Sequence, residues 1–165
     1  MSELEICQRH PKALAPDGSR PPGAPAWIDS VDNPYLHGLF APISTEVSAV
    51  DLEVDGELPR DLAGAYLRNG PNNHFPPKNR HHWFDGDGMV HGIWFEDGRA
   101  RYCNRWIQTR GLALELEKNG PIWPGVLGPF DFSLPHGPLK DTANTDLITH
   151  AGKVLALWYE SGQVH

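Results

Sequence analysis

A two-residue turn between apolar runs is the feature that most restricts how this chain can fold. Asp97-Gly98 follows residues 89–95 and precedes residues 100–107, and both runs are rich in apolar side chains. Asp-Gly is favoured in two-residue hairpin turns because both positions take a positive φ. The sequence therefore predicts an antiparallel hairpin built from these two runs.

Further strands are predicted from the same kind of pattern. Residues 146–149 and 153–159 are apolar or β-branched and flank the turn-forming segment 150–152, which predicts a second hairpin. In residues 50–54, valine and leucine alternate with acidic residues. Strict alternation is typical of a half-buried strand, so a strand is predicted there too.

Glycine and proline set the rest of the organisation. The chain has 17 glycines and 16 prolines in 165 residues, which favours many turns over long helices and allows one domain. A proline-rich stretch predicts a flexible leader over residues 1–32, and residues 33–42 predict an extended arm packed on the body. Helix formers at 112–118 predict one or two helical turns. An all-β sandwich, barrel or propeller is indicated.

Charge and cysteine content limit the partners and the compartment. Lys and Arg number 14 against 21 Asp and Glu, a net charge of −7, so a basic nucleic-acid-binding face is not expected. Cys7 and Cys103 stand far apart in no redox or metal motif, which predicts free thiols and a reducing compartment. No apolar run approaches the roughly 18 residues of a membrane-spanning helix. We expect a cytoplasmic protein.

Histidine is frequent, with nine residues in the chain. His81, His82 and His91 surround Asp85-Gly86-Asp87-Gly88, so one hypothesis is a histidine-rich metal-binding domain. Their spacing matches no zinc motif, and adjacent histidines point to opposite faces of an extended chain. Ordinary strand or turn positions are the favoured interpretation.

Several segments occur in an order typical of one family. The main three are LPRDLAGAYLRNGPN at 58–72, WFDGDGMVH at 83–91 and YCNRWIQT at 102–109. They are extended by NPYL at 33–36, FAP at 40–42, DTANT at 141–145 and LALWYE at 155–160. Together, over residues 33–163, they resemble the amino-terminal part of the carotenoid cleavage oxygenases.

The resemblance implies a fold and an activity. The fold is all-β: residues 33–165 form the opening blades of a seven-bladed β-propeller, incomplete here, with an extended N-terminal arm. Proteins of this family hold Fe(2+) on the propeller axis with four histidines and use O2 to split a conjugated C=C bond. The implied partners are O2 and a hydrophobic polyene or stilbene-type substrate, a carotenoid, apocarotenoid or stilbene, with peripheral membrane contact during its uptake. No oligomeric state follows.

The resemblance also assigns roles to particular residues. Carboxylates near such an iron hydrogen-bond the ligating imidazoles and orient them, and Glu160 stands where one of these glutamates is found. A scaffold role, fixing turns and polar links, is expected for Arg68, Asn69, Asp85, Asp87 and Gly88. Phe84 and Trp106 could line a substrate tunnel, although a core position is expected for each.

No residue of the chain is assigned as a catalytic group or a metal ligand. The first iron-ligating histidine of the family is expected some tens of residues after Glu160, and none of the nine histidines, His91 and His150 included, matches a ligand. We therefore expect the iron ligands beyond His165 and the 165-residue chain alone to be incomplete and inactive. The alternative is a catalytically inactive fragment or a small β interaction module without metal.

Overall fold

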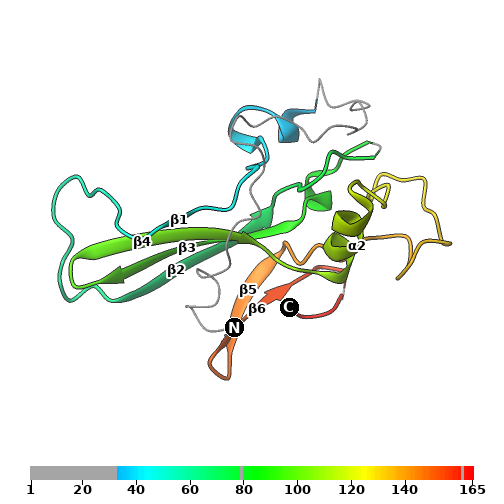
Figure 1. The fold of residues 1–165 in the computed structure, drawn as a ribbon. Helices are drawn as coiled ribbons and strands as arrows, with labels where there is room; N and C mark the ends of the chain where they lie inside the picture. Colours follow the sequence, from blue (N-terminus) through cyan, green and yellow to red (C-terminus); the bar gives the residue numbers. More distant parts are fainter. Residues whose placement is uncertain (1–32, 79, 161) are drawn as a thin grey trace.

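The computed structural model describes residues 33–78, 80–160 and 162–165, and these residues form a mostly β structure. The predicted leader at 1–32 lies outside the described residues, as does Cys7. In these ranges, two antiparallel sheets and the α-helix α2 (Arg110–Lys118) make up most of the regular structure (Figure 1). Within the described ranges, no helix has the length and apolar character needed to cross a bilayer.

The larger sheet has four strands in the order β1-β4-β3-β2. They are β1 (Ser48–Ala49), β2 (Gly64–Pro71), β3 (Gly88–Glu96) and β4 (Arg99–Trp106). Every neighbouring pair is antiparallel. The strand β2 was not predicted from the sequence, because its residues 64–71 are mainly small and polar and are mostly exposed or half-buried rather than alternating.

Both predicted hairpins are confirmed. Asp97 and Gly98 take φ values of 47° and 73° between β3 and β4, as a two-residue turn requires. The second hairpin pairs β5 (Asp146–His150) with β6 (Lys153–Leu157). Its turn is formed by Ala151 and Gly152 with φ of 49° and 75°, so His150 ends the strand instead of lying in the turn.

The two sheets are joined by a polar link at β2. The Asn69 side-chain amide donates to the carbonyl oxygens of Ala143, at 2.7 Å, and Asp146, at 3.4 Å. Figure 1 shows β5 and β6 on the opposite side of the larger sheet from the N-terminal arm. The scaffold role predicted for Asn69 is confirmed by these bonds.

The prediction of a strand at residues 50–54 is wrong. This segment bends away, and Val50 is 87% exposed. Polar side chains of β4 bind the chain just upstream instead: the Asn104 carboxamide oxygen accepts from the Val47 amide at 2.6 Å, and Arg105 donates to the Val47 carbonyl at 2.9 Å. Backbone pairing with β4 therefore covers β1 and two flanking bonds, from the Asn104 amide to the Val47 carbonyl at 3.2 Å and from the Leu52 amide to the Ala100 carbonyl at 2.9 Å.

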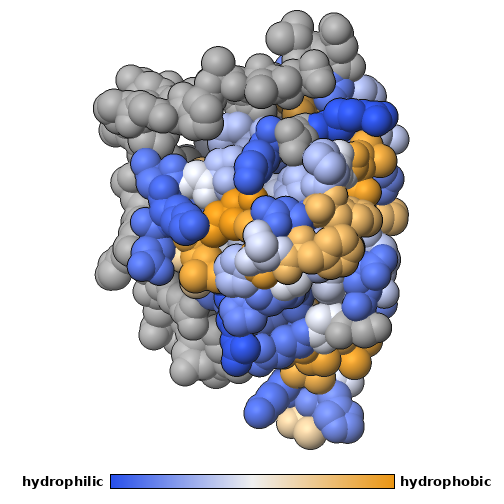
Figure 2. Space-filling view, turned by 90° about the vertical axis from the view of Figure 1, so that its right-hand side faces the viewer, coloured by the Kyte–Doolittle hydropathy of each residue, from blue (hydrophilic) through white to orange (hydrophobic). Residues whose placement is uncertain are grey.

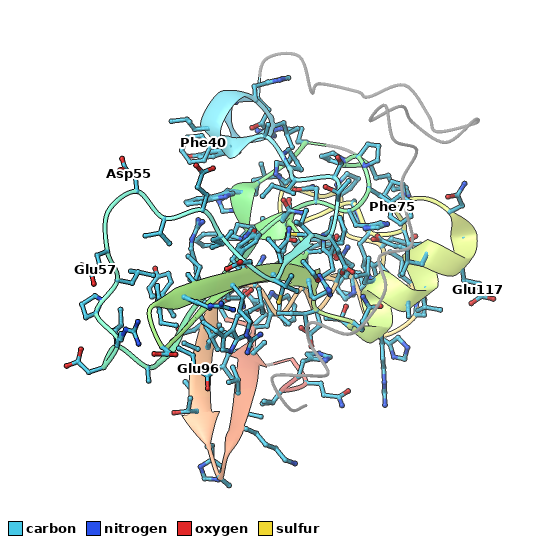
Figure 3. All side chains as sticks on the ribbon, turned by 60° about the vertical axis from the view of Figure 1, so that its left-hand side comes forward. Phe40, Asp55, Glu57, Phe75, Glu96 and Glu117 are labelled. Atoms are coloured by element: carbon cyan, nitrogen blue, oxygen red, sulfur yellow. The ribbon has the colours of Figure 1, made fainter. Side chains whose placement is uncertain are left out.

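The N-terminal arm is less extended than expected. It contains two short 3-10 helices, η1 (Pro34–Leu36) and η2 (Gly38–Phe40). The Asn33 side chain caps η1 by accepting from the Tyr35 amide at 3.0 Å. Figure 3 shows the Phe40 side chain beside these turns, at the edge of the molecule.

The helix α2 packs against the larger sheet where β3 begins and β4 ends. Thr109 caps its start by accepting from the Leu112 amide at 3.1 Å, and Asn119 ends it in the left-handed conformation. Leu112 is 1% exposed and contacts the buried Met89 and Trp106 of the sheet. The core position predicted for Trp106 is confirmed.

Replacing Asn104 tests whether side-chain hydrogen bonds hold the arm on the sheet. Asn104 is 1% exposed, accepts from the Val47 amide and donates to the Thr45 carbonyl at 3.1 Å. We expect Asn104→Ala to lower the free energy of unfolding by about 1–3 kcal/mol, since buried polar groups lose their partners. Urea unfolding measures this, with Thr149→Ala on exposed β5 as the control. Equal losses in the two variants would contradict the assignment.

Candidate functional site

A buried ionic cluster joins three segments that lie far apart in the sequence. The Lys140 ammonium lies 2.7 Å from Asp87 Oδ1 and 2.7 Å from Glu115 Oε2. Asp87 directly precedes β3, Glu115 is on α2, and Lys140 is in the loop before β5. All three side chains are 9% exposed or less.

Backbone amides complete the coordination of the two carboxylates. Asp87 Oδ2 accepts from the His74 amide at 3.1 Å, and Glu115 Oε1 accepts from the Ile122 amide at 2.9 Å. Buried charges are tolerated only when they are paired and hydrogen-bonded, and both conditions are met here. We call Asp87, Lys140 and Glu115 the ionic cluster.

The protonation of the cluster follows from its burial and charge. Burial raises the pKa of the Glu115 carboxyl above its ordinary value, and the nearby Lys140 ammonium opposes that rise. Burial alone lowers the pKa of Lys140, but Asp87 and Glu115 outweigh it, so that this pKa is raised. The two carboxylates therefore favour the charged form of Lys140.

Asp85 fixes a second polar centre beside the cluster. It ends the short helix η3 (Trp83–Asp85), and its two oxygens accept from the amides of His82 and Val126, each at 2.8 Å. The carboxamide of Asn144 donates to the carbonyls of Phe84 and Gly86 at 2.8 and 2.6 Å. The scaffold roles predicted for Asp85 and Asp87 are confirmed by these contacts.

Gly88 and Arg68 complete the predicted scaffold set. A Cβ at Gly88 would come within 2.6 Å of the Ala143 carbonyl oxygen, so the backbones approach too closely there for any side chain. Arg68 lies on β2 opposite His91, and its charge helps burial to lower the pKa of that histidine. Arg68 is exposed on the surface of β2, and its scaffold role stays a prediction.

A small cavity lies between η3, α2 and the segment after β6. Its volume is about 50 Å³. Charged and polar side chains line it together with aromatic ones, among them His81, Asp85, Lys140, Phe84, Trp158 and Tyr159. Phe84 is 46% exposed, so the core position expected for it is wrong.

Glu160 follows β6 at the edge of this region. The segment that carries it is held by the Tyr159 amide, which donates to Thr145 Oγ1 at 3.1 Å, and by the Gln163 amide, which donates to Asp141 Oδ2 at 2.8 Å. Tyr159 packs its ring 5.5 Å from that of Phe84. Burial, the Glu160 carboxylate and Asp85 together raise the pKa of Tyr159. Glu160 itself is exposed.

The three clustered histidines of the sequence serve different local purposes. His81 is buried at the cavity, His82 Nδ1 caps η3 by accepting from the Phe84 amide, and His91 Nδ1 lies 2.8 Å from the Tyr102 hydroxyl. In the part of the chain that the structure describes, no three His, Cys, Asp or Glu side chains are grouped so as to hold a metal ion. The hypothesis of a metal centre made from His81, His82 and His91 is therefore wrong.

Comparison with known proteins identifies the family of this chain. The model of the retinal pigment epithelial membrane protein family matches residues 40–165. A carotenoid cleavage oxygenase of Mycobacterium tuberculosis is 45% identical over 139 residues, covering 81% of this chain and 25% of that protein. The chain belongs to the carotenoid cleavage oxygenase family.

Solved structures of other carotenoid cleavage oxygenases agree with the fold. The lignostilbene dioxygenase of Pseudomonas brassicacearum superposes with a TM-score of 0.69 at 30% identity, over 77% of this chain and 27% of that one. Cobalt-substituted Synechocystis ACO gives a TM-score of 0.62 at 34% identity, over 75% and 27%. The chain thus spans about a quarter of the length of the carotenoid cleavage oxygenases it matches.

Sequence analysis did not identify Lys140 or Glu115 in this oxygenase-family chain. A signal was present for Glu115, because it lies three residues after Leu112 and so shares the apolar face of the predicted helix. A carboxylate on such a face needs hydrogen-bond donors or an opposite charge when it is buried. Nothing local indicated that Lys140, 25 residues further along, supplies that charge.

Removing the cation of the ionic cluster should destabilise the protein strongly. Lys140→Met leaves Asp87 and Glu115 buried without their shared partner, and breaking a buried pair in this way costs about 3–5 kcal/mol. Thermal or urea unfolding measures the loss. Lys153→Met, at the exposed first residue of β6, is the matched control and should stay close to wild type. A similar, small effect in both variants would show that the cluster is dispensable.

Acid should destabilise the folded state through its buried histidines. Burial lowers the pKa of His74 and His81, despite the nearby carboxylates of Asp87 and Asp85. Below the ordinary histidine pKa of about 6.5, the unfolded chain therefore binds more protons than the folded one. We expect the free energy of unfolding to fall as the pH drops below about 6.5.

A pair of asparagine variants isolates the contribution of His81. Urea unfolding followed from about pH 7.5 to pH 5.5 should show a shallower fall in His81→Asn than in the wild type. His150→Asn, at the exposed end of β5, should keep the wild-type slope. A stability independent of pH in this window would disprove the linkage.

Proposed function

We propose that this protein oxidatively cleaves a conjugated C=C bond of a carotenoid, apocarotenoid or stilbene-type substrate, using O2 at a non-haem Fe(2+). The family match over residues 40–165 carries this proposal. It is supported by similarity to a protein named carotenoid cleavage oxygenase and to a lignostilbene dioxygenase. The choice among the three substrate classes is left to assay.

The proposed architecture is the opening of a seven-bladed β-propeller. Propeller blades are commonly four-stranded antiparallel sheets, and the β1-β4-β3-β2 sheet has this form. The hairpin β5–β6 is proposed as the start of the next blade. The last described residue supports this, because His165 and Ala156 of β6 exchange two backbone hydrogen bonds, of 2.7 and 3.2 Å.

The described residues do not fit the implied iron as its ligands. They hold no group of three metal-ligating side chains, so we propose that the four histidines are contributed by residues outside those described. No chemical step is assigned to this part of the chain. Its proposed contribution is Glu160, whose carboxylate would accept a hydrogen bond from a ligating imidazole and orient it.

The remaining proposals concern partners and location. Figure 2 shows the side of the molecule that carries α2 and the loop after it, where apolar patches interrupt the polar surface. Phe130 and Phe132 of that loop are 49% and 78% exposed. Such side chains suit peripheral contact with a membrane during uptake of an apolar substrate. A cytoplasmic location is proposed because Cys7 and Cys103 stand far apart in the sequence, in no redox or metal motif.

The alternative is a β interaction module without catalytic metal. One observation favours it: in the ranges the structure describes, no metal-ligating group is assembled. Metal content and cleavage activity distinguish the two functions, because the module should have neither.

Loading with iron tests the proposed function directly. The protein at its natural length is purified without metal, loaded anaerobically with Fe(2+), and assayed for bound iron and for O2-dependent loss of the absorbance of a stilbene and of an apocarotenal. We expect one iron per chain and cleavage of at least one substrate. Neither iron nor cleavage would overturn the proposal and favour the interaction module.

The role of Glu160 has its own matched control. Glu160→Gln keeps the shape of the side chain but removes the charge, and loss of such an orienting carboxylate costs about 10–100-fold in metal affinity or activity. Glu117→Gln is the control, because Glu117 is exposed and extends outward from α2 (Figure 3). Equal activity of the two variants would remove Glu160 from the metal site.

A further inference from the structure

The sequence contains two Asn-Gly pairs, Asn69-Gly70 on β2 and Asn119-Gly120 at the end of α2. An asparagine followed by glycine is chemically vulnerable, because glycine has no side chain to keep its backbone nitrogen away from the side-chain carbonyl carbon of the asparagine. The two pairs lie in very different surroundings in the structure.

The carboxamide of Asn69 is held at both of its polar atoms. Its Nδ2 donates to the carbonyl oxygens of Ala143 and Asp146, at 2.7 and 3.4 Å, and its Oδ1 accepts from the Gly70 amide at 2.9 Å. Gly70 is also part of β2 and pairs with Met89 of β3. A reaction at the Asn69 side chain therefore has to break the link between the two sheets and distort a paired strand.

Asn119 lacks these restraints. It is exposed, and among the described residues its carboxamide makes no hydrogen bond. Apart from its chain neighbours, nothing lies within 4 Å of the place that a Cβ of Gly120 would take. Backbone bonds fix this end of α2: the Gly120 amide donates to the Glu115 carbonyl at 3.1 Å, and the Asn119 amide donates to the Leu116 carbonyl at 3.3 Å. Because helix ends fray, these bonds open far more readily than a paired strand does.

We propose that Asn119 is a modification site, at which spontaneous deamidation converts the side-chain amide to a carboxylate, and that Asn69 is protected from the same reaction. This inference does not depend on the oxygenase function proposed above.

The reaction needs no reagent other than water. When the last turn of α2 opens, the Gly120 nitrogen loses its proton to solvent and attacks the side-chain carbonyl carbon of Asn119. A C–N bond forms to Gly120, the bond to the side-chain nitrogen breaks, and ammonia leaves after taking a proton from solvent. Water then opens the resulting succinimide ring at either carbonyl carbon, which gives aspartate or isoaspartate. No electron is transferred, so no oxidant or reductant is required.

The products should weaken the end of α2. Asn119 has φ 53° and ψ 44°, a left-handed conformation that asparagine adopts more readily than most residues. A new carboxylate at this position meets the negative end of the helix dipole, which is unfavourable. In isoaspartate the main chain also runs through one additional carbon atom, and this displaces the Gly120 amide from the Glu115 carbonyl.

This end of α2 is directly connected to the ionic cluster through Glu115. The Glu115 carbonyl accepts the hydrogen bond from Gly120, while the Glu115 carboxylate lies 2.7 Å from the Lys140 ammonium and accepts from the Ile122 amide at 2.9 Å. Loss of the last helical turn therefore loosens the residue that fastens α2 to the loop before β5. We expect deamidation at Asn119 to lower the midpoint of thermal unfolding.

Peptide mapping of aged protein tests the site. The natural-length protein is incubated in mildly alkaline buffer made with water labelled in its oxygen, and mass spectrometry follows the two Asn-Gly peptides. We expect the Asn119 peptide to become an acid that carries labelled oxygen and to contain isoaspartate, while the Asn69 peptide stays an amide. Gly120→Ala should slow the reaction, because the added methyl group crowds ring closure and fits the open space. Gly70→Ala, where a Cβ would meet Arg68 at an ordinary 3.8 Å, is the matched control and should not change the reaction at Asn119.

Two substitutions of Asn119 test the consequence for stability. Asn119→Asp should lower the midpoint of thermal unfolding and speed hydrogen exchange of the Gly120 amide. Asn119→Gly should change neither, because glycine suits the left-handed conformation, and it should abolish the modification. If Gly120→Ala fails to fold, Asn119→Gly serves as the unreactive variant. An Asn119 peptide that stays an amide, or an Asn69 peptide that reacts as fast, overturns the proposal, and unchanged stability in Asn119→Asp contradicts the link to the ionic cluster.

Discussion

The pairing of Lys140 with two carboxylates is the interaction on which the arrangement of this chain depends. It joins the start of β3, the helix α2 and the loop that leads into β5 through contacts of 2.7 Å to Asp87 and Glu115. These segments share little other regular structure, because β5 and β6 form a sheet of their own. A buried carboxylate without its cation is strongly unfavourable, so none of the three segments can move away without exposing a charge.

Asparagine side chains hold the irregular segments in a similar way. Asn72 accepts from the Ile43 amide at 2.7 Å and donates to the Ile43 carbonyl at 2.9 Å, and so imitates one rung of a β-ladder. Asn104 accepts from the Val47 amide and donates to the Thr45 carbonyl in a similar way, and Asn144 donates to the carbonyls of Phe84 and Gly86. Buried backbone groups must be paired, and where no strand supplies the partner a carboxamide does. This explains how long loops remain ordered around a small core of Met89, Trp106 and Leu112.

Sequence patterns predicted the features that depend on local conformation. Asp97-Gly98 and Ala151-Gly152 adopt positive φ, and this local requirement located both hairpins. The prediction of a strand at residues 50–54 was wrong, because an alternating sequence does not show whether a neighbouring strand is available for pairing. The side chain of Asn104 on β4 binds residues 45–47 instead. Phe84 was expected in the core, yet Asn144 and Asp85 hold its segment at the surface, where its ring meets Tyr159.

By itself, the sequence determined the two hairpins, the short helix and membership of the carotenoid cleavage oxygenase family, because turn chemistry and ordered motifs act over a few neighbouring residues. Only the tertiary structure decided which charges meet and which distant residues line one cavity. Glu115 and Lys140 are 25 residues apart, and His81 and Trp158 lie on segments from distant parts of the chain. The packing of distant segments brings these residues together and buries them, and a local sequence pattern does not predict that packing.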